Sequence, residues 1–354
     1  MIDLDDERAL AAGDPGRMLA TIADLGPQCG DGYALGLATE GLPSGEGVTA
    51  VAFCGMGGSA VAGDALRELF RGRLGVPIDV HRDPELPEFC GPHTLVVCSS
   101  YSGNTAETLA CFEEALSRGC RIVPVTSGGA LAARSAEEGL GIVRVPPGSM
   151  PRAALGYLGC SVLGALERIG LLPPLRADVD DTVAELERLA DRLGPAIPRR
   201  DNPAKELAWQ IGDRAPLLWG AEGIGAVAAA RWKTQFNENA KVPAWSSALP
   251  ELDHNEVVGW AHPAGAAYFL MALRHDGEHP DVAARFPHSI AIVREAGAAV
   301  EEVWGAGTSP LGRLMSLVIM GDFTSAYHAL AHGVDPTPVA AIDRVKAALA
   351  EAMP

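Results

Sequence analysis

The segment at residues 98–109, CSSYSGNTAETL, places several hydroxyl side chains between an apolar run and the start of a helical pattern. The hydroxyl groups belong to Ser99, Ser100, Ser102 and Thr105. Hydroxyls and backbone N–H groups at a helix N-terminus bind anions, and the helix dipole adds partial positive charge there. The segment therefore predicts a phosphate-binding turn, although an ordinary serine-rich turn that caps a helix has the same composition.

A second loop of this kind, CGMGGSAVAGD at residues 54–64, follows the apolar run at residues 49–53. Gly57 and Gly58 let the backbone approach an anion closely, and Ser59 adds a hydroxyl. Two such loops at two strand ends suit one phosphomonoester. Ser59 would then join Ser100, Ser102 and Thr105 around the phosphate of a sugar phosphate.

The same loop also satisfies a dinucleotide-binding fingerprint. Gly55, Gly57 and Ala60 match the pattern G-x-G-x-x-G/A, and Asp79 ends a predicted next strand, where an acid that binds ribose is expected. An NAD-binding oxidoreductase is thus an alternative. The sugar-phosphate interpretation is favoured because a pyrophosphate needs only one of the two loops.

Two segments in the second half carry groups for acid–base chemistry. Glu238 lies in FNENAK (residues 236–241) at the end of a helical pattern, and His254 lies in PELDHNE (residues 250–256). A carboxylate that moves a carbon-bound proton and an imidazole that serves a hydroxyl or ring oxygen are what a proton-transfer isomerase needs. Alternatives are a solvated helix end with a polar loop, or a metal site of Asp253, His254 and Glu256. The metal interpretation is weaker because no second histidine lies at ligand spacing.

Two basic residues are further candidates. Arg152 follows a proline at the start of a predicted helix, where the helix dipole disfavours a cation, so we expect it to serve a site. Lys346 lies in the last predicted helix, residues 338–350, near its C-terminal end. The helix dipole and solvent alone explain a lysine at that position.

Composition limits the class of protein. A chain of 354 residues with 48% hydrophobic residues predicts two domains, and the net charge of −17 disfavours nucleic acid as a partner. The seven cysteines are odd in number and form no C-x-x-C pair, which indicates reduced core residues of a cytoplasmic protein. The N-terminus lacks the apolar stretch of a secretory signal, and no segment has the length and apolarity of a transmembrane helix, so no membrane partner is expected.

The elements that would position these residues follow an α/β order. Apolar strands near residues 49–54, 76–80, 94–98, 121–126 and 141–145 alternate with helical patterns, and strands near 215–220, 266–273 and 300–304 begin a second such series. A proline-flanked charged helix separates the two halves. We expect an N-terminal domain over residues 1–195, which carries the phosphate loops, and a C-terminal domain over residues 196–354, which carries the acid–base groups.

Taken together, GMGGSA, SYSGNTAET, PRAAL, FNENAK, PELDHNE and the closing DPTP and IDRVK resemble the bifunctional phosphoglucose/phosphomannose isomerases of the sugar isomerase (SIS) superfamily, from about residue 50 to the C-terminus. The resemblance implies two SIS-type subdomains, each a parallel sheet between helices. It implies that the phosphate is held by Gly57, Gly58, Ser59, Ser100, Ser102 and Thr105. Glu238 then shuttles a proton between C1 and C2, Arg152 stabilises the enediolate, and His254 with Lys346 assists ring opening.

The resemblance further implies a homodimer in which His254 comes from the neighbouring subunit. Because the stabilising charge is Arg152 and the acid–base groups are side chains, we expect an activity that needs no metal and no cofactor. Ala240 departs from the family, whose members often have serine there, but it touches no proposed catalytic group. Thr337 is a small residue that would leave room for rotation about C2–C3, so that glucose 6-phosphate and mannose 6-phosphate share one pocket. A non-catalytic sugar-phosphate sensor is an alternative that would keep the loops and lose the acid–base set.

Overall fold

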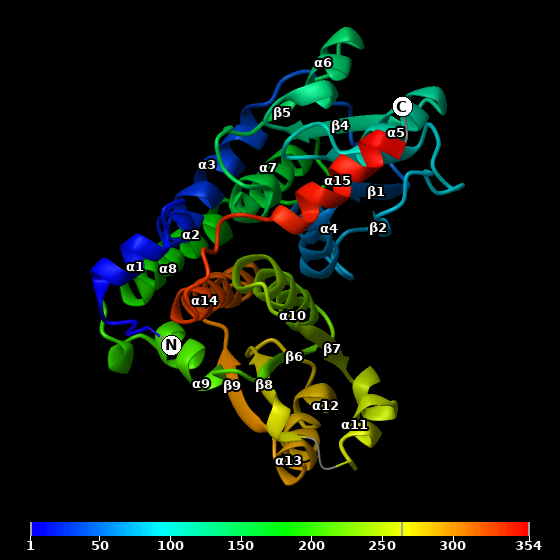
Figure 1. Ribbon diagram of the computed structural model, residues 1–354. Coiled ribbons are helices and arrows are strands. Elements are labelled where there is room, and N and C mark those ends of the chain that lie inside the picture. Colours follow the sequence, from blue (N-terminus) through cyan, green and yellow to red (C-terminus); the bar gives the residue numbers. More distant parts are fainter. Residues whose placement is uncertain (1, 263–264, 353–354) are drawn as a thin grey trace.

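The computed structural model describes residues 2–262 and 265–352, which form two parallel sheets with helices around them (Figure 1). The first sheet has the order β2-β1-β3-β4-β5. Its strands are β1 (Ala50–Gly55), β2 (Ile78–His81), β3 (Thr94–Ser99), β4 (Arg121–Thr126) and β5 (Val143–Arg144). The central strands β1 and β3 are buried because helices cover both faces, which explains their nearly continuous apolar sequences.

The second sheet has the order β7-β6-β8-β9, and all its strands are also parallel. They are β6 (Ala215–Ala221), β7 (Trp245–Leu249), β8 (Tyr268–Arg274) and β9 (Ala299–Trp304). In Figure 1 this sheet occupies the lower half of the view and the first sheet the upper half. The fold class expected from the sequence is confirmed.

Helices connect the strands and the two halves. In the first half they are α1 (Glu7–Gly13), α2 (Met18–Ala23), α3 (Leu25–Ala38), α4 (Gly57–Leu69), α5 (Ala106–Ser117), α6 (Gly129–Glu137), α7 (Leu155–Arg168) and α8 (Arg176–Leu193). In the second half they are α9 (Pro203–Ile211), α10 (Ile224–Gln235), α11 (Glu256–Gly259), α12 (Pro280–Ala283), α13 (Phe286–Glu295), α14 (Pro310–Ala331) and α15 (Ala340–Ala352). Short helical turns are η1 (Pro151–Ala153), η2 (Arg199–Asp201), η3 (Phe236–Ala240), η4 (Glu251–His254) and η5 (Gly265–Ala267).

Helix α14 is the central element between the halves. It contacts α8, α9 and α10, and α10 also contacts α4 of the first half. Nearly every residue of α14 is buried, as expected for a helix that is apolar on all sides. Its Gly321 is required by close packing, since a Cβ there would lie 2.3 Å from the indole of Trp232 on α10. Polar residues on α14 must therefore find partners inside the protein.

The sequence predicted most strands to within a few residues, with three differences. Strand β7 was missed because WSSAL is an edge strand with little burial and a weak apolar pattern. Helices α1 to α3 were not predicted, and the helical pattern of residues 281–296, which predicts one helix, corresponds to the two helices α12 and α13. The boundary predicted at residue 195 falls between α8 and η2 and stays a prediction. None of the helices in the described ranges is both long and apolar enough to cross a membrane.

Candidate active site

The two hydroxyl loops leave the first sheet at neighbouring positions. Strands β1 and β3 are paired in parallel, with Gly55 opposite Ser99 at their carboxyl ends. A Cβ on Gly55 would lie only 3.0 Å from the carbonyl oxygen of Ser99 and 3.2 Å from the Cβ of Ser59. The loop after β1 and the loop after β3 therefore converge at one edge of the sheet, where parallel sheets bind ligands.

Both helices that follow these loops begin without a side-chain cap. No side chain caps the backbone N–H groups at the start of α4 or α5. Other helices, such as α7 and α10, also lack a side-chain cap, whereas α1, α9 and α14 are capped by Asp6, Asn202 and Ser309. The first-turn N–H groups of α4 and α5 thus remain open to an anion, and two helix dipoles favour negative charge at the same place.

The hydroxyl groups in these loops differ in their freedom to bind. Ser59 and Ser100 are buried, Thr105 is half-buried, and Ser102 is exposed. The Ser100 and Thr105 hydroxyl oxygens lie 2.8 Å apart, and the backbone N–H of Gly103 donates to Ser100 Oγ at 3.1 Å. The hydrogen bond between the two hydroxyls uses one of their two protons, so one proton remains to bind a ligand.

Arg152 lies directly beside the first loop. A Cβ on Gly58 would lie 2.8 Å from the carbonyl oxygen of Pro151, so the loop contacts the η1 turn that carries Arg152. The sequence predicted that Arg152 starts a long helix, but α7 begins at Leu155 and Arg152 belongs to η1 instead. Its side chain points inward, and the residue is only 3% exposed.

The guanidinium of Arg152 is fixed on two sides. Its Nε donates to Asn239 Oδ1 at 2.9 Å, and its Nη2 donates to the carbonyl oxygens of Pro336 and Thr337, each at 2.8 Å. The remaining nitrogen, Nη1, lies 3.7 Å from Oε2 of Glu238. Among the described residues Nη1 donates no hydrogen bond, so it is the nitrogen available to a ligand.

Glu238 lies in η3, a π-helical turn that continues α10. Such turns are rare and often mark functional sites, because the extra residue re-aims the side chains. The neighbouring Asn239 is fully buried, whereas the Glu238 side chain keeps 26% of its surface exposed. Burial lowers the pKa of Arg152, and the Glu238 carboxylate opposes that shift. A carboxylate that reaches solvent and a buried cation thus face each other beside the phosphate loops.

Lys241, which the sequence did not single out, closes the same turn. It adopts a left-handed backbone conformation with φ of 58°. Its Nζ donates to the carbonyl oxygens of Glu238 at 2.8 Å, Asn239 at 3.1 Å and Pro336 at 3.0 Å. Partial burial and the charge of Arg152 lower the pKa of Lys241 to about 8. The sequence did not indicate a role for Lys241 in the site, because the helix dipole alone explains a lysine just after a helix.

His254 and Lys346 are not brought to this site within one chain. His254 ends η4, just after β7, and is exposed. Lys346 lies on α15, which leads away from α14 in Figure 1 and whose Ile342, Val345 and Leu349 are also exposed. Among the described residues, no hydrogen bond or ion pair joins His254 or Lys346 to Glu238 or Arg152.

The residues of the two alternative interpretations have other surroundings. Asp253 accepts hydrogen bonds from Arg285 at 3.1 Å and Ser289 at 2.6 Å, whereas Glu256 accepts one from the Trp219 indole at 2.8 Å. Across residues 2–262 and 265–352 no group of three or more His, Cys, Asp or Glu side chains could hold a metal ion. Asp79, the candidate ribose-binding acid, lies in β2, and its side chain is about half exposed. Its Oδ2 lies 3.8 Å from Nδ1 of His81.

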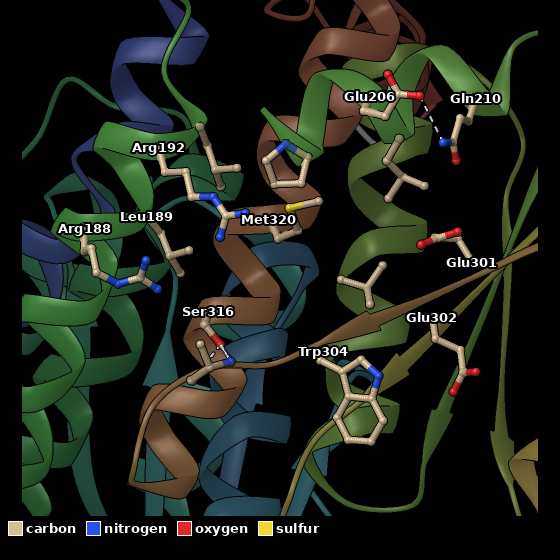
Figure 2. Close-up of a pocket in the computed structure, with 15 residues that line it drawn as sticks. Arg188, Leu189, Arg192, Glu206, Gln210, Glu301, Glu302, Trp304, Ser316 and Met320 are labelled. Atoms are coloured by element: carbon tan, nitrogen blue, oxygen red, sulfur yellow. Dashed lines mark hydrogen bonds between the residues drawn. The ribbon is translucent and has the colours of Figure 1, made fainter. Parts of the chain in front are cut away.

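A separate cavity of about 320 Å³ lies between α8, α9, β9 and α14 (Figure 2). Arg188 and Arg192 line one side, and Glu301, Glu302 and Trp304 line another. None of the residues predicted to bind phosphate or to transfer protons lines it. Several of its charges are already neutralised, since Arg188 pairs with Glu185 and Glu302 pairs with Arg274.

Comparison with known proteins gives consistent results. The family pattern described as the bacterial phospho-glucose isomerase C-terminal SIS domain matches residues 200–349. The chain is 35% identical to a bifunctional phosphoglucose/phosphomannose isomerase of Caldicellulosiruptor bescii, over 94% of this chain and 99% of the relative. It is 38% identical to a protein of the same name from Aquifex aeolicus, over 84% of this chain and 89% of that relative. A glucose-6-phosphate isomerase like protein of Thermus thermophilus has a similar fold, with a TM-score of 0.63 and 22% sequence identity. The superposition covers 98% of this chain and 99% of that chain.

Proposed function

The chain belongs to the family of bifunctional phosphoglucose/phosphomannose isomerases, and from this premise we propose that it interconverts glucose 6-phosphate and mannose 6-phosphate with fructose 6-phosphate through a cis-enediol intermediate. The observation that carries the proposal is the meeting of Glu238 and Arg152 beside two uncapped helix N-termini. This arrangement offers an anion site, a base and a fixed cation in one place.

The substrate phosphate binds between the two loops. The N–H groups that begin α4 and α5 and the hydroxyls of Ser59, Ser100, Ser102 and Thr105 donate to its oxygens. The net charge of −17 makes such local donors necessary, because the overall field repels the substrate. A phosphate held by backbone groups also fixes the sugar carbons relative to Glu238.

Proton transfer follows ring opening. Glu238 removes the hydrogen from C2 of the open aldose, and the electron pair moves onto the carbonyl oxygen to give the enediolate. Arg152 Nη1 stabilises the negative charge of the enediolate, and the formation of this charge is the main barrier to the reaction. A proton then passes from the O2 hydroxyl to O1, the C2 carbonyl forms, and Glu238 returns its proton to C1, which gives the ketose. Rotation about C2–C3 in the intermediate would present either face of C2, so both epimers react.

Ring opening is assigned to His254 and Lys346, and we propose that the dimer is what brings them to the site. Both residues are exposed within one chain, and α15 carries exposed apolar side chains that a second subunit would cover. The reaction as written needs no metal and no cofactor. We place the protein in the cytoplasm, and in the structure all seven cysteines are free and six are buried.

The test of this function is turnover of each sugar phosphate by the purified protein. Glucose 6-phosphate and mannose 6-phosphate should both be converted to fructose 6-phosphate, and the activity should survive chelators and the absence of nucleotides. Binding of fructose 6-phosphate without turnover would support the sensor alternative. A thermal shift with NADH and none with fructose 6-phosphate would support the oxidoreductase alternative.

Loss of one phosphate donor is expected to weaken binding. Thr105→Val keeps the side-chain shape and Ser102→Ala removes an exposed hydroxyl. Each should raise KM for fructose 6-phosphate by about tenfold, corresponding to about 1–2 kcal/mol for one hydrogen bond to a charged group, with kcat little changed. Ser117→Ala at the opposite end of α5 is the matched control, because its hydroxyl serves only the helix end. An unchanged KM in both loop variants would show that the phosphate binds at another place.

Mixing two inactive variants tests the shared site. Glu238→Gln and His254→Ala are each expected to be inactive as homodimers. A mixed dimer has one site with both defects and one site with an intact Glu238 and an intact partner His254. Random assortment makes half of the dimers mixed, so about a quarter of wild-type activity should return, as two-fold symmetry requires. Co-expressed chains with different tags verify the mixed dimers, and inactivity of those dimers would rule out a shared site.

A further inference from the structure

We propose that the buried ion pair between Arg231 and Asp322 is a positioning device for Arg152, which works together with Asn239 and Ser325. None of these four residues needs to touch the substrate. Their role is to hold both the backbone and the side chain of Arg152, so that Nη1 faces the reacting carbons. The inference rests on the proposed isomerase function and extends it to residues that have no role in the sequence analysis.

The first connection holds the backbone of Arg152. Arg231 on α10 is 1% exposed, and its guanidinium binds Asp322 on α14 in a bidentate manner, at 3.1 Å from Nε to Oδ1 and 2.7 Å from Nη2 to Oδ2. The same Nη2 donates to the carbonyl oxygen of Arg152 at 2.5 Å. The ion pair is therefore attached directly to the η1 turn, on which Gly58 of the phosphate loop also packs.

The second connection holds the side chain of Arg152. Asn239 accepts a hydrogen bond from Arg152 Nε, and its own amide donates to Ser325 Oγ at 3.0 Å. Ser325 Oγ in turn donates to the carbonyl oxygen of Asp322 at 2.9 Å. Asp322 and Ser325 lie one turn apart on the same face of α14, so one helix face holds both ends of Arg152.

The charges of the network support the same role. Arg231 is a second cation close to Arg152 and lowers its pKa, whereas Asp322 and Glu238 raise it. Asp322 thus balances the repulsion between two buried guanidinium groups that lie near the phosphate loops. Because Asp322 is itself fully desolvated, its own pKa is raised by burial and lowered by Arg231.

Stability alone does not require such a pair. Replacing a buried ion pair by apolar side chains of similar volume is often neutral or stabilising, whereas the loss of one partner is costly. An apolar pair would fill the same space but could not hold the carbonyl oxygen of Arg152. This difference separates a positioning role from a structural one.

The experiment replaces both partners at once, as Arg231→Met with Asp322→Leu. We expect a folded protein whose unfolding midpoint is close to that of the wild type and whose kcat is about 10- to 100-fold lower, the usual cost when a supporting residue is lost. KM for fructose 6-phosphate should stay within about threefold, since the phosphate donors are intact. Affinity for 5-phosphoarabinonate, whose carboxylate mimics the enediolate, should fall with kcat.

A double-mutant cycle identifies the residue through which the pair acts. In an Arg152→Lys background the same double replacement should lower kcat by less than about twofold, because the group that it positions is already lost. Multiplication of the two effects would overturn the proposal, as would a folded double variant with wild-type kcat and analogue affinity. Absence of turnover by the wild-type protein would instead refute the proposed function.

Three further variants keep the test decisive. If the double replacement does not fold, Ser325→Ala removes the acceptor for the Asn239 amide together with the donor to the Asp322 carbonyl oxygen, and it should lower kcat several-fold, with recovery in Ser325→Thr. Wild-type kcat in Ser325→Ala would then count against the proposal. Arg274→Met with Glu278→Leu is the control, since that pair has hydrogen bonds of 2.8 to 3.1 Å and Arg274 also pairs with Glu302, but in the described part of the chain neither residue contacts the site residues through a hydrogen bond. It should keep kcat within about twofold of wild type.

Discussion

Replacing Glu238 by glutamine is expected to lower kcat for isomerisation by about 10²- to 10⁴-fold while fructose 6-phosphate still binds. The amide has the shape of the carboxylate but cannot accept the C2 proton. The phosphate donors belong to α4, α5 and their loops, and none of them contacts Glu238 through a hydrogen bond. The loss should therefore appear in kcat and leave KM nearly unchanged.

Two measurements check this prediction. A coupled assay gives kcat and KM, and exchange of the C2 hydrogen with deuterium from solvent reports proton removal even when no product forms. Both rates should fall together in Glu238→Gln. Glu222→Gln is a control in the same half of the protein, since Glu222 is exposed and, among the residues that the structure describes, its carboxylate pairs only with Arg71. A Glu238→Gln variant that keeps activity within about tenfold of the wild type would remove Glu238 as the base.

Arg152→Lys is expected to lower kcat by about 10²- to 10³-fold, the range found when one group that stabilises a developing oxyanion is removed. Lysine keeps the charge but lacks the planar fork. It cannot donate to Asn239 and to the carbonyl oxygens of Pro336 and Thr337 while also facing the substrate. The charge-conserving change thus tests the geometry and not only the presence of a cation.

The same variant should be less stable, because carbonyl and amide oxygens that Arg152 now satisfies would lose their donors, at about 1–3 kcal/mol for each buried group. Thermal unfolding measures that loss separately from kcat. Activity is therefore compared at a temperature where both proteins are folded. Wild-type kcat in folded Arg152→Lys would contradict the assignment of Arg152 to the enediolate.

The sequence by itself determined the parts that depend on neighbours along the chain. Apolar runs predicted the strands at residues 94–98 and 121–126, and small and hydroxyl residues predicted the loops that follow the first and third strands. A strand pattern and a turn composition are local properties, so their periods can be read without knowing the fold. The family motifs likewise identified Glu238 and Arg152 as separate candidates.

Only the tertiary structure decided which of these groups meet and how they are held. Arg152 and Asn239 are 87 residues apart in the chain, and Arg231 and Asp322 are 91 residues apart. No local pattern records such contacts, because they arise when α10 and α14 pack between the two sheets. The contact between the Lys241 ammonium and the carbonyl oxygen of Pro336, 95 residues further along the chain, likewise forms only on folding.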